Sequence, residues 1–295
     1  MDNKPKLQAN EVWKVLRLAL PEEEHFPVDV KRVALEISKA KFSDPITEIT
    51  ACPLPGFEGM LARNQAGTKW MIAYNDKLES DGRIRFTLAH EFGHYLMHRS
   101  LREQFKCTQE DMHAWDSLER AIEAEADTFA SFLLMPIDDF RHQVDGQKFS
   151  IDLLMHCTNR YGVSLTAAAL KWRDISNGRV IVVAAKDGFL DWSCSNNAAY
   201  RSGAYFATKR DTVEVPEGSL LNSAVWTSGG QTGSIRASAW FSKEPDGMMI
   251  EEHAFVIEGK DYCYTLGVLL LPDVERSADE EDELLTPLSG GMSFR

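Results

Sequence analysis

Apolar positions along the first half of the chain follow two different spacings, which together predict one α+β domain. Over residues 29–40 they recur every three or four residues, as in a helix packed by one face, at Val30, Val33, Ala34 and Ile37. Over 46–75, prolines and glycines divide the chain into short strands, and 69–74 is the clearest of them. Helical spacing returns at about residue 83. We expect these elements to form a domain over 1–148.

The pattern changes twice in the second half of the chain. Two helices are predicted around Gly162 within 150–175, with Ser164 or Thr166 as the cap of the second, in a shape like a helix-turn-helix. After Asn177-Gly178, glycine turns separate predicted strands at 180–185, 189–193, 211–216, 235–242, 253–257 and 261–271. We therefore expect a helical connector over 149–176, a β-rich sensor or docking domain over 177–274, and an acidic, disordered tail over 275–295.

One helical segment also carries candidate chemistry. Residues His90-Glu91-Phe92-Gly93-His94 read H-E-x-x-H. Side chains four apart share a helix face, so both histidines can reach one metal ion, and Glu91 is placed to act as general base toward a metal-bound water. Apolar neighbours predict a buried helix, in which polar side chains need partners that a metal supplies. Gly93 costs a helix about 1 kcal/mol, which the close approach of another backbone or of a substrate would explain.

A third metal ligand is predicted in the next helix, over 116–135. Catalytic zinc sites commonly combine three protein ligands, among them His-His-Glu sets, with one water. Glu123 and Asp127 are four apart and share a face, so one can bind the metal while the other orients a ligating histidine. This spacing favours Glu123 as the ligand and Asp127 as the orienting group. Glu119 lies on the same face and is the rival, whereas Glu125 points elsewhere; both are interpreted as solvated acids.

These two segments resemble the ImmA/IrrE-type zinc metallopeptidases, whose core has the gluzincin arrangement. The match rests on Phe86–His94 and on Glu123–Pro136, which follows E-x-x-A-N-x-F-A-x-x-L-L-M-P with Asp127 in the Asn place. It extends to the helical element at 161–172 and is loose beyond about 175. The resemblance implies Glu123 as third ligand and an endopeptidase that cleaves a helix-turn-helix repressor, which relieves repression in a stress or mobile-element response. Three ligands with an open fourth position imply one Zn²⁺ per chain.

Composition narrows the classes of protein. The chain has 295 residues, 44% of them hydrophobic and 26% charged, which is typical of soluble globular proteins. Its longest apolar runs are too short to span a bilayer, and its first residues lack a signal-peptide core, so we expect a cytoplasmic protein without a membrane partner. Five scattered cysteines argue against a disulfide framework or a cysteine zinc site.

The net charge of −13 disfavours broad nucleic-acid binding and suits a basic protein partner. Two alternatives to the enzyme remain. The first is a noncatalytic regulator that keeps the zinc site, and the second is a DNA-binding regulator built on the helices of 150–175. The second of these helices has one lysine and much alanine and leucine, which indicates a packed helix rather than one that reads a groove.

Substrate binding and catalysis lead to three further expectations. A strand within 57–75 is a candidate to hold an extended substrate by strand addition, with plain sheet packing as an equal alternative. Residues 99–115 are predicted to form a loop over the site. An oxyanion donor is also needed, and Tyr95, His98 and His113 are candidates among which the sequence does not choose.

Overall fold

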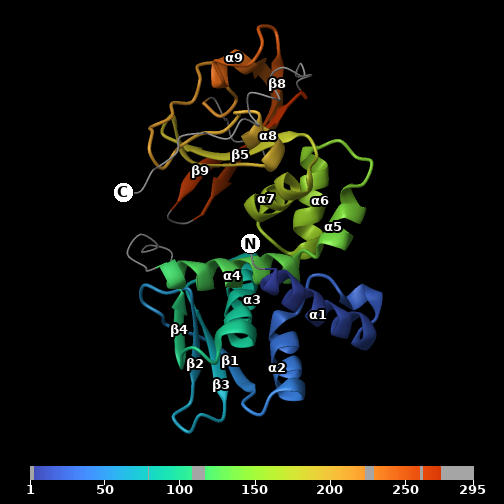
Figure 1. The fold of residues 1–295 in the computed structure, drawn as a ribbon, viewed down its shortest axis with the longest axis vertical. Helices are drawn as coiled ribbons and strands as arrows, with labels where there is room; N and C mark the ends of the chain where they lie inside the picture. The colour runs from blue at the N-terminus through green and yellow to red at the C-terminus, as the bar shows by residue number, and fades with distance from the viewer. Residues whose placement is uncertain (1–2, 79, 108–116, 223–228, 260–261, 274–295) are drawn as a thin grey trace, which may run out of the picture. The chain divides into compact units, whose positions relative to one another are not determined.

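The chain folds into two compact units, Met1–Trp172 and Arg173–Arg295. The computed structural model describes residues 3–78, 80–107, 117–222, 229–259 and 262–273. The described part is mixed α+β, with an N-terminal sheet and helices, a helical region after them and a β-rich C-terminal part, as the sequence predicts (Figure 1). Within it, none of the helices combines the length and the apolar composition that crossing a bilayer requires.

The first unit contains a four-stranded sheet and seven α-helices among its described residues, the last of which runs across the boundary between the units. The strands are β1 (Ile46–Cys52), β2 (Gly59–Arg63), β3 (Trp70–Asn75) and β4 (Gln104–Cys107). The helices are α1 (Lys4–Ala19), α2 (Val30–Lys41), α3 (Asp81–His98), α4 (Ser117–Leu134), α5 (Ile137–Val144), α6 (Ile151–Tyr161) and α7 (Leu165–Ile175), with a short 3-10 helix at Glu22–Glu24.

The sheet has the order β1-β3-β2-β4, with β1 parallel to β3 and the other pairs antiparallel. Both strands that lie within 57–75 are therefore paired on both sides, so the expectation that one of them offers a free edge to substrate is wrong. The prediction of a loop over 99–115 is also wrong in part. Residue Phe105 is buried and pairs with Leu61 of β2, so its segment joins the sheet as β4. The predicted candidate His113 lies outside the described residues.

Helices α3 and α4 pack against each other and form the core of the first unit. A Cβ atom on Gly93 would lie 2.9 Å from Cδ1 of Phe129 and 3.4 Å from Cα of Ala126. The glycine therefore allows the close approach of α4, as the sequence predicts. Leu118, near the start of α4, is exposed, and the buried apolar positions of this helix begin at Ile122.

The turn between α6 and α7 follows its predicted chemistry. Gly162 has a φ of 59°, in the left-handed region that favours glycine, and ends α6. Ser164 caps α7, since its hydroxyl accepts a hydrogen bond from the amide of Ala167. The lysine of α7, Lys171, is buried with its ammonium 3.8 Å from the ring centroid of Phe132. This helix is therefore packed, as its composition predicts.

The second unit is built on an antiparallel sheet with the order β6-β5-β9-β8-β7. Its elements are β5 (Arg179–Lys186), β6 (Phe189–Ser195), α8 (Asn197–Arg201), β7 (Gln231–Arg236), α9 (Ala237–Trp240), β8 (Met249–Glu258) and β9 (Cys263–Leu271). Buried residues from four of the strands and both short helices share one apolar core, and the partly buried Ile235 of β7 packs against it.

Two strands predicted for this unit differ from those observed. The run 211–216 makes only an isolated bridge between Glu214 and Phe189, although Val215 is buried. The run 235–242 is strand only to Arg236 and then turns into α9. Ala237 and Trp240 are both buried and lie three residues apart, a spacing that one helical turn satisfies and a strand does not.

Candidate metal centre

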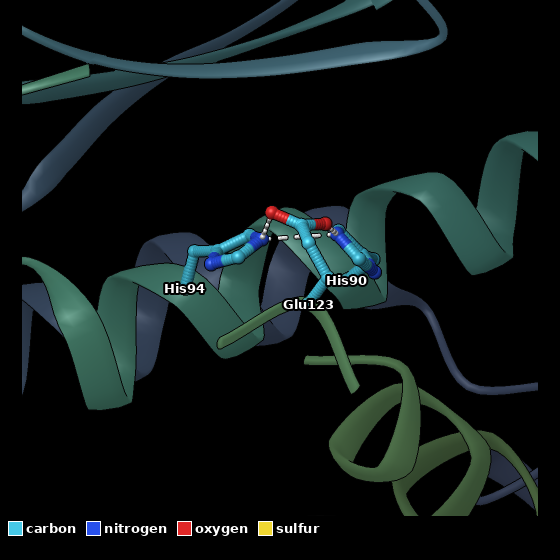
Figure 2. A group of neighbouring side chains, drawn as sticks. All are labelled: His90, His94 and Glu123. Carbon is cyan, nitrogen blue, oxygen red and sulfur yellow. Dashed lines mark hydrogen bonds and ion pairs between the residues drawn. The ribbon is translucent and has the colours of Figure 1, made fainter. Parts of the chain in front are cut away.

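Three side chains from α3 and α4 meet at one point. His90 and His94 stand one turn apart on α3, and Glu123 reaches between them from α4 (Figure 2). The Nε2 atoms of the two histidines are 3.0 Å apart. Oε2 of Glu123 lies 3.0 Å from Nε2 of His90, and its Oε1 lies 3.3 Å from Nε2 of His94. The structure thus brings together the three residues predicted as ligands.

The spacing of these atoms fits a tetrahedral metal ion. Ligand bonds of about 2.0–2.1 Å to zinc place two tetrahedral ligands about 3.3 Å apart. The observed separations of 3.0, 3.0 and 3.3 Å are close to that value. Two imidazole nitrogens and one carboxylate are also a donor set that suits zinc. The group can therefore hold a metal ion with one coordination position left for water.

Burial makes this cluster dependent on a cation. His94 is fully buried and His90 is nearly so. Burial lowers the pKa of His94 to about 4 against the opposing effect of Glu123. Burial would also lower the pKa of His90, but hydrogen bonds with Asp127 and Glu123 and the charge of Glu91 raise it to about 10. Without a metal, these contacts therefore favour a proton on His90, and metal binding would release that proton.

Glu123 is held in its charged form by the same contacts. Burial alone would raise the pKa of its carboxyl group, yet the hydrogen bonds with His90 and His94 lower it to about 2. The third ligand position therefore carries a full negative charge at neutral pH, which a divalent cation neutralises.

Asp127 lies where an orienting carboxylate is expected. Its Oδ1 is 2.9 Å from Nδ1 of His90, on the side of the ring opposite to the ligand cluster. Such a carboxylate fixes the ring and directs the lone pair of Nε2 toward a metal.

His94 has a different partner, a histidine that lies four residues further along α3. Its Nδ1 lies 3.1 Å from Nδ1 of His98, and Nε2 of His98 lies 3.0 Å from Oε2 of Glu125. The ring of Phe105 stacks on His94 at 4.7 Å between centroids. The interpretation of Glu125 as a solvated acid is therefore wrong. Glu119, the rival of Glu123 for the role of third ligand, forms an ion pair with Arg102 at 2.9 Å.

Glu91 is fully buried, with its carboxylate between α3 and the start of β2. A Cβ atom on Gly59 would collide with Oε1 of Glu91 and would lie 2.6 Å from Cγ2 of Thr87. The absence of a side chain at residue 59 therefore makes room for Glu91. The sequence carries no signal that Gly59 makes this room, because Gly59 and Glu91 come together only through the fold.

The described oxyanion candidates are both engaged elsewhere. The hydroxyl of Tyr95 donates a hydrogen bond to the backbone oxygen of Asp44 at 3.1 Å, and His98 faces His94.

Comparisons with known proteins agree with this geometry. Residues 44–173 match the model of the Peptidase M78 family, described as the IrrE N-terminal-like domain, and this range includes all three members of the cluster. No curated protein matches the chain. A solved structure, a transcriptional regulator of Mycobacterium tuberculosis, has a similar fold, with a TM-score of 0.57 and 14% identity over 92% of this chain and 76% of that one. The chain therefore carries a domain of the IrrE N-terminal-like family, as its motifs predict.

Proposed function

We propose that the protein is a zinc-dependent endopeptidase in which His90, His94 and Glu123 bind the metal and Glu91 is the general base. The observation that carries this proposal is the convergence of three donor atoms, 3.0–3.3 Å apart. Two of them come from α3, which reads H-E-x-x-H, and the third comes from α4. The family of the domain supports a peptidase.

Each residue has a distinct part in peptide hydrolysis. A bound zinc ion would polarise the substrate carbonyl and lower the pKa of a water toward about 7. Glu91, which follows a ligand on the helix, would take the proton of that water and deliver it to the leaving amine. Asp127 would hold the ring of His90 and keep its Nε2 available for the metal.

A helix-turn-helix repressor is the substrate we propose, in a cytoplasmic stress or mobile-element response. This rests on the resemblance to ImmA/IrrE-type peptidases and on the net charge of −13, which would attract a basic DNA-binding protein. The β-rich part over 177–274 would then serve as the sensor or docking domain, joined through the connector over 149–176.

A noncatalytic zinc-binding regulator is the second candidate, and the similar fold of a transcriptional regulator favours it. Direct DNA binding has less support. The lysine of α7 is buried against Phe132 and does not present its charge to a phosphate backbone.

The variant Glu91→Gln separates the enzyme from this second candidate. Glutamine keeps the size of the side chain and removes the base, so zinc content and folding should stay at wild-type levels. Cleavage of the partner repressor should fall by on the order of 10²-fold or more. Glu119→Gln is the matched control, since this acid pairs with Arg102 outside the cluster. A zinc-loaded Gln variant that cleaves as fast as wild type would exclude Glu91 as base, and equal inactivity of both on every repressor tried would favour the noncatalytic regulator.

A further inference from the structure

The partner of His94 is another imidazole rather than a carboxylate. His90 meets Asp127 directly, whereas His94 reaches a carboxylate only through a second ring, along the path His94, His98, Glu125. His98 is buried, with 2% of its surface exposed. When two imidazole nitrogens face each other inside a protein, one must carry a proton and the other a lone pair. Two N–H groups would repel each other, and two lone pairs would make no hydrogen bond.

The position of each proton follows from the geometry. Nε2 of His94 faces the ligand cluster, 3.3 Å from Glu123, and must carry a lone pair to bind a metal. Its proton then lies on Nδ1, which donates to Nδ1 of His98 over 3.1 Å. His98 must accept there, so its own proton lies on Nε2, which donates to the carboxylate of Glu125 over 3.0 Å. Every donor in the path thus meets an acceptor.

We propose that His98 and Glu125 are positioning residues that select the metal-binding tautomer of His94. This rests on the proposed role of His94 as a ligand. Glu125 only accepts hydrogen bonds when charged, so it requires the proton of His98 on Nε2. The opposite tautomer of His98 would place an N–H against His94 and move the proton of His94 onto Nε2, where it would block the metal. Phe105, stacked on His94, holds the ring plane for this path.

The test is the zinc dissociation constant, measured by competition with a chelator. His98→Phe keeps an aromatic ring and removes the acceptor, and Glu125→Ala removes the group that selects the tautomer. Both should bind zinc about 10–100-fold more weakly than wild type, while still binding one ion at saturation. His98→Asn offers a carbonyl near the position of Nδ1, so most of the affinity should return. Glu119→Ala is the control on the same helix and should bind as wild type does.

A second measurement reports the tautomer itself. Long-range ¹H–¹⁵N correlation spectra of the zinc-loaded protein should show His98 protonated at Nε2 in wild type and a mixture of tautomers in Glu125→Ala. A role in folding alone would leave this signature unchanged. Circular dichroism verifies that each variant folds. If His98→Phe does not fold, Glu125→Ala decides the affinity test, because 26% of the Glu125 side chain is exposed and its loss is easier to tolerate.

The outcomes separate this inference from the proposed function. The positioning role of His98 and Glu125 would be overturned by a wild-type zinc affinity in folded His98→Phe or in Glu125→Ala. It would also be overturned if His98 of the wild-type protein were protonated at Nδ1. If Glu123→Ala nevertheless loses zinc, the ligand set stands and only the positioning role of His98 and Glu125 fails. If Glu123→Ala binds zinc as tightly as wild type, the ligand set itself is wrong.

Discussion

Single residues of α3 show which parts of the site are readable from local spacing. His90 and His94 could be paired from the sequence because residues four apart on a helix must share a face. The same argument placed Glu125 away from Glu123 and therefore missed that it meets His98. Contacts between distant segments, such as Gly59 against Glu91, depend on how the sheet packs on the helix. No periodicity within either segment records them.

Gly59→Ala should reduce catalysis while leaving zinc in place. The added methyl group would collide with Oε1 of Glu91, and the backbone of residue 59 has no positive φ that would itself strain an alanine. Displacing a catalytic group by a fraction of an ångström to an ångström costs on the order of 10–100-fold in rate. The measurement is kcat together with zinc content. Gly178→Ala is the control, because its new Cβ would meet nothing closer than 4.0 Å. Unchanged kcat in zinc-loaded Gly59→Ala would contradict this placement of Glu91.

Whole elements were predictable where one spacing runs through the segment. The helix predicted over 29–40 appears as Val30–Lys41 with Asp29 as its cap, and the strand predicted over 69–74 appears as Trp70–Asn75. Prediction failed where a short segment is shaped by its neighbours. Strand β4 forms because Phe105 packs on β2. Helix α9 replaces part of a predicted strand because two buried residues stand three apart.

The contact between α5 and α6 gives a prediction about stability and pH. Asp139 of α5 accepts hydrogen bonds from Nε and Nη2 of Arg160 at 2.9 and 2.7 Å and from the hydroxyl of Tyr161 at 2.6 Å. Burial would raise the pKa of Asp139, but these partners lower it. Asp139→Asn should therefore reduce the free energy of unfolding at pH 7 by about 1–3 kcal/mol.

The sign of the pH effect follows from the lowered pKa. A carboxyl whose pKa is lower in the folded state stabilises the protein at neutral pH, and this contribution is lost as the pH falls below the ordinary value of about 3.9. The difference in melting temperature between wild type and Asp139→Asn should thus shrink from pH 7 to pH 3. Asp138→Asn, at the exposed ion pair with Arg17, should show a smaller difference at pH 7. If the difference in melting temperature between wild type and Asp139→Asn stays constant or grows toward low pH, the assigned contacts of Asp139 are contradicted.

Among the described residues, the candidate metal ligands all lie in the first of the two units. The cluster lies within Met1–Trp172, and the segment that matches the family, residues 44–173, ends one residue beyond that unit. The second unit has its own sheet and its own apolar core. From the change to strand spacing after Asn177-Gly178, the sequence predicts a β-rich domain over 177–274 that follows a helical connector over 149–176. The similarity to a solved transcriptional regulator extends over 92% of the chain and so includes both units.

A fragment of residues 1–175, which keeps all of α7, should fold and bind one zinc ion per chain. The reason is that every proposed ligand and orienting group lies in the first unit. Circular dichroism and metal analysis of the fragment, beside the full chain, provide the measurement. A folded fragment that lacks zinc would show that the second unit contributes to the site.

The zinc content of Glu123→Ala tests the central claim most directly. Wild type purified with zinc available should hold one ion per chain by metal analysis, because three converging donors leave one open position. Glu123→Ala should hold far less, since it removes one of the three proposed ligands, while Glu119→Ala should match wild type. Equal zinc in the two variants, with both folded, would contradict the assignment of His90, His94 and Glu123 as the metal centre.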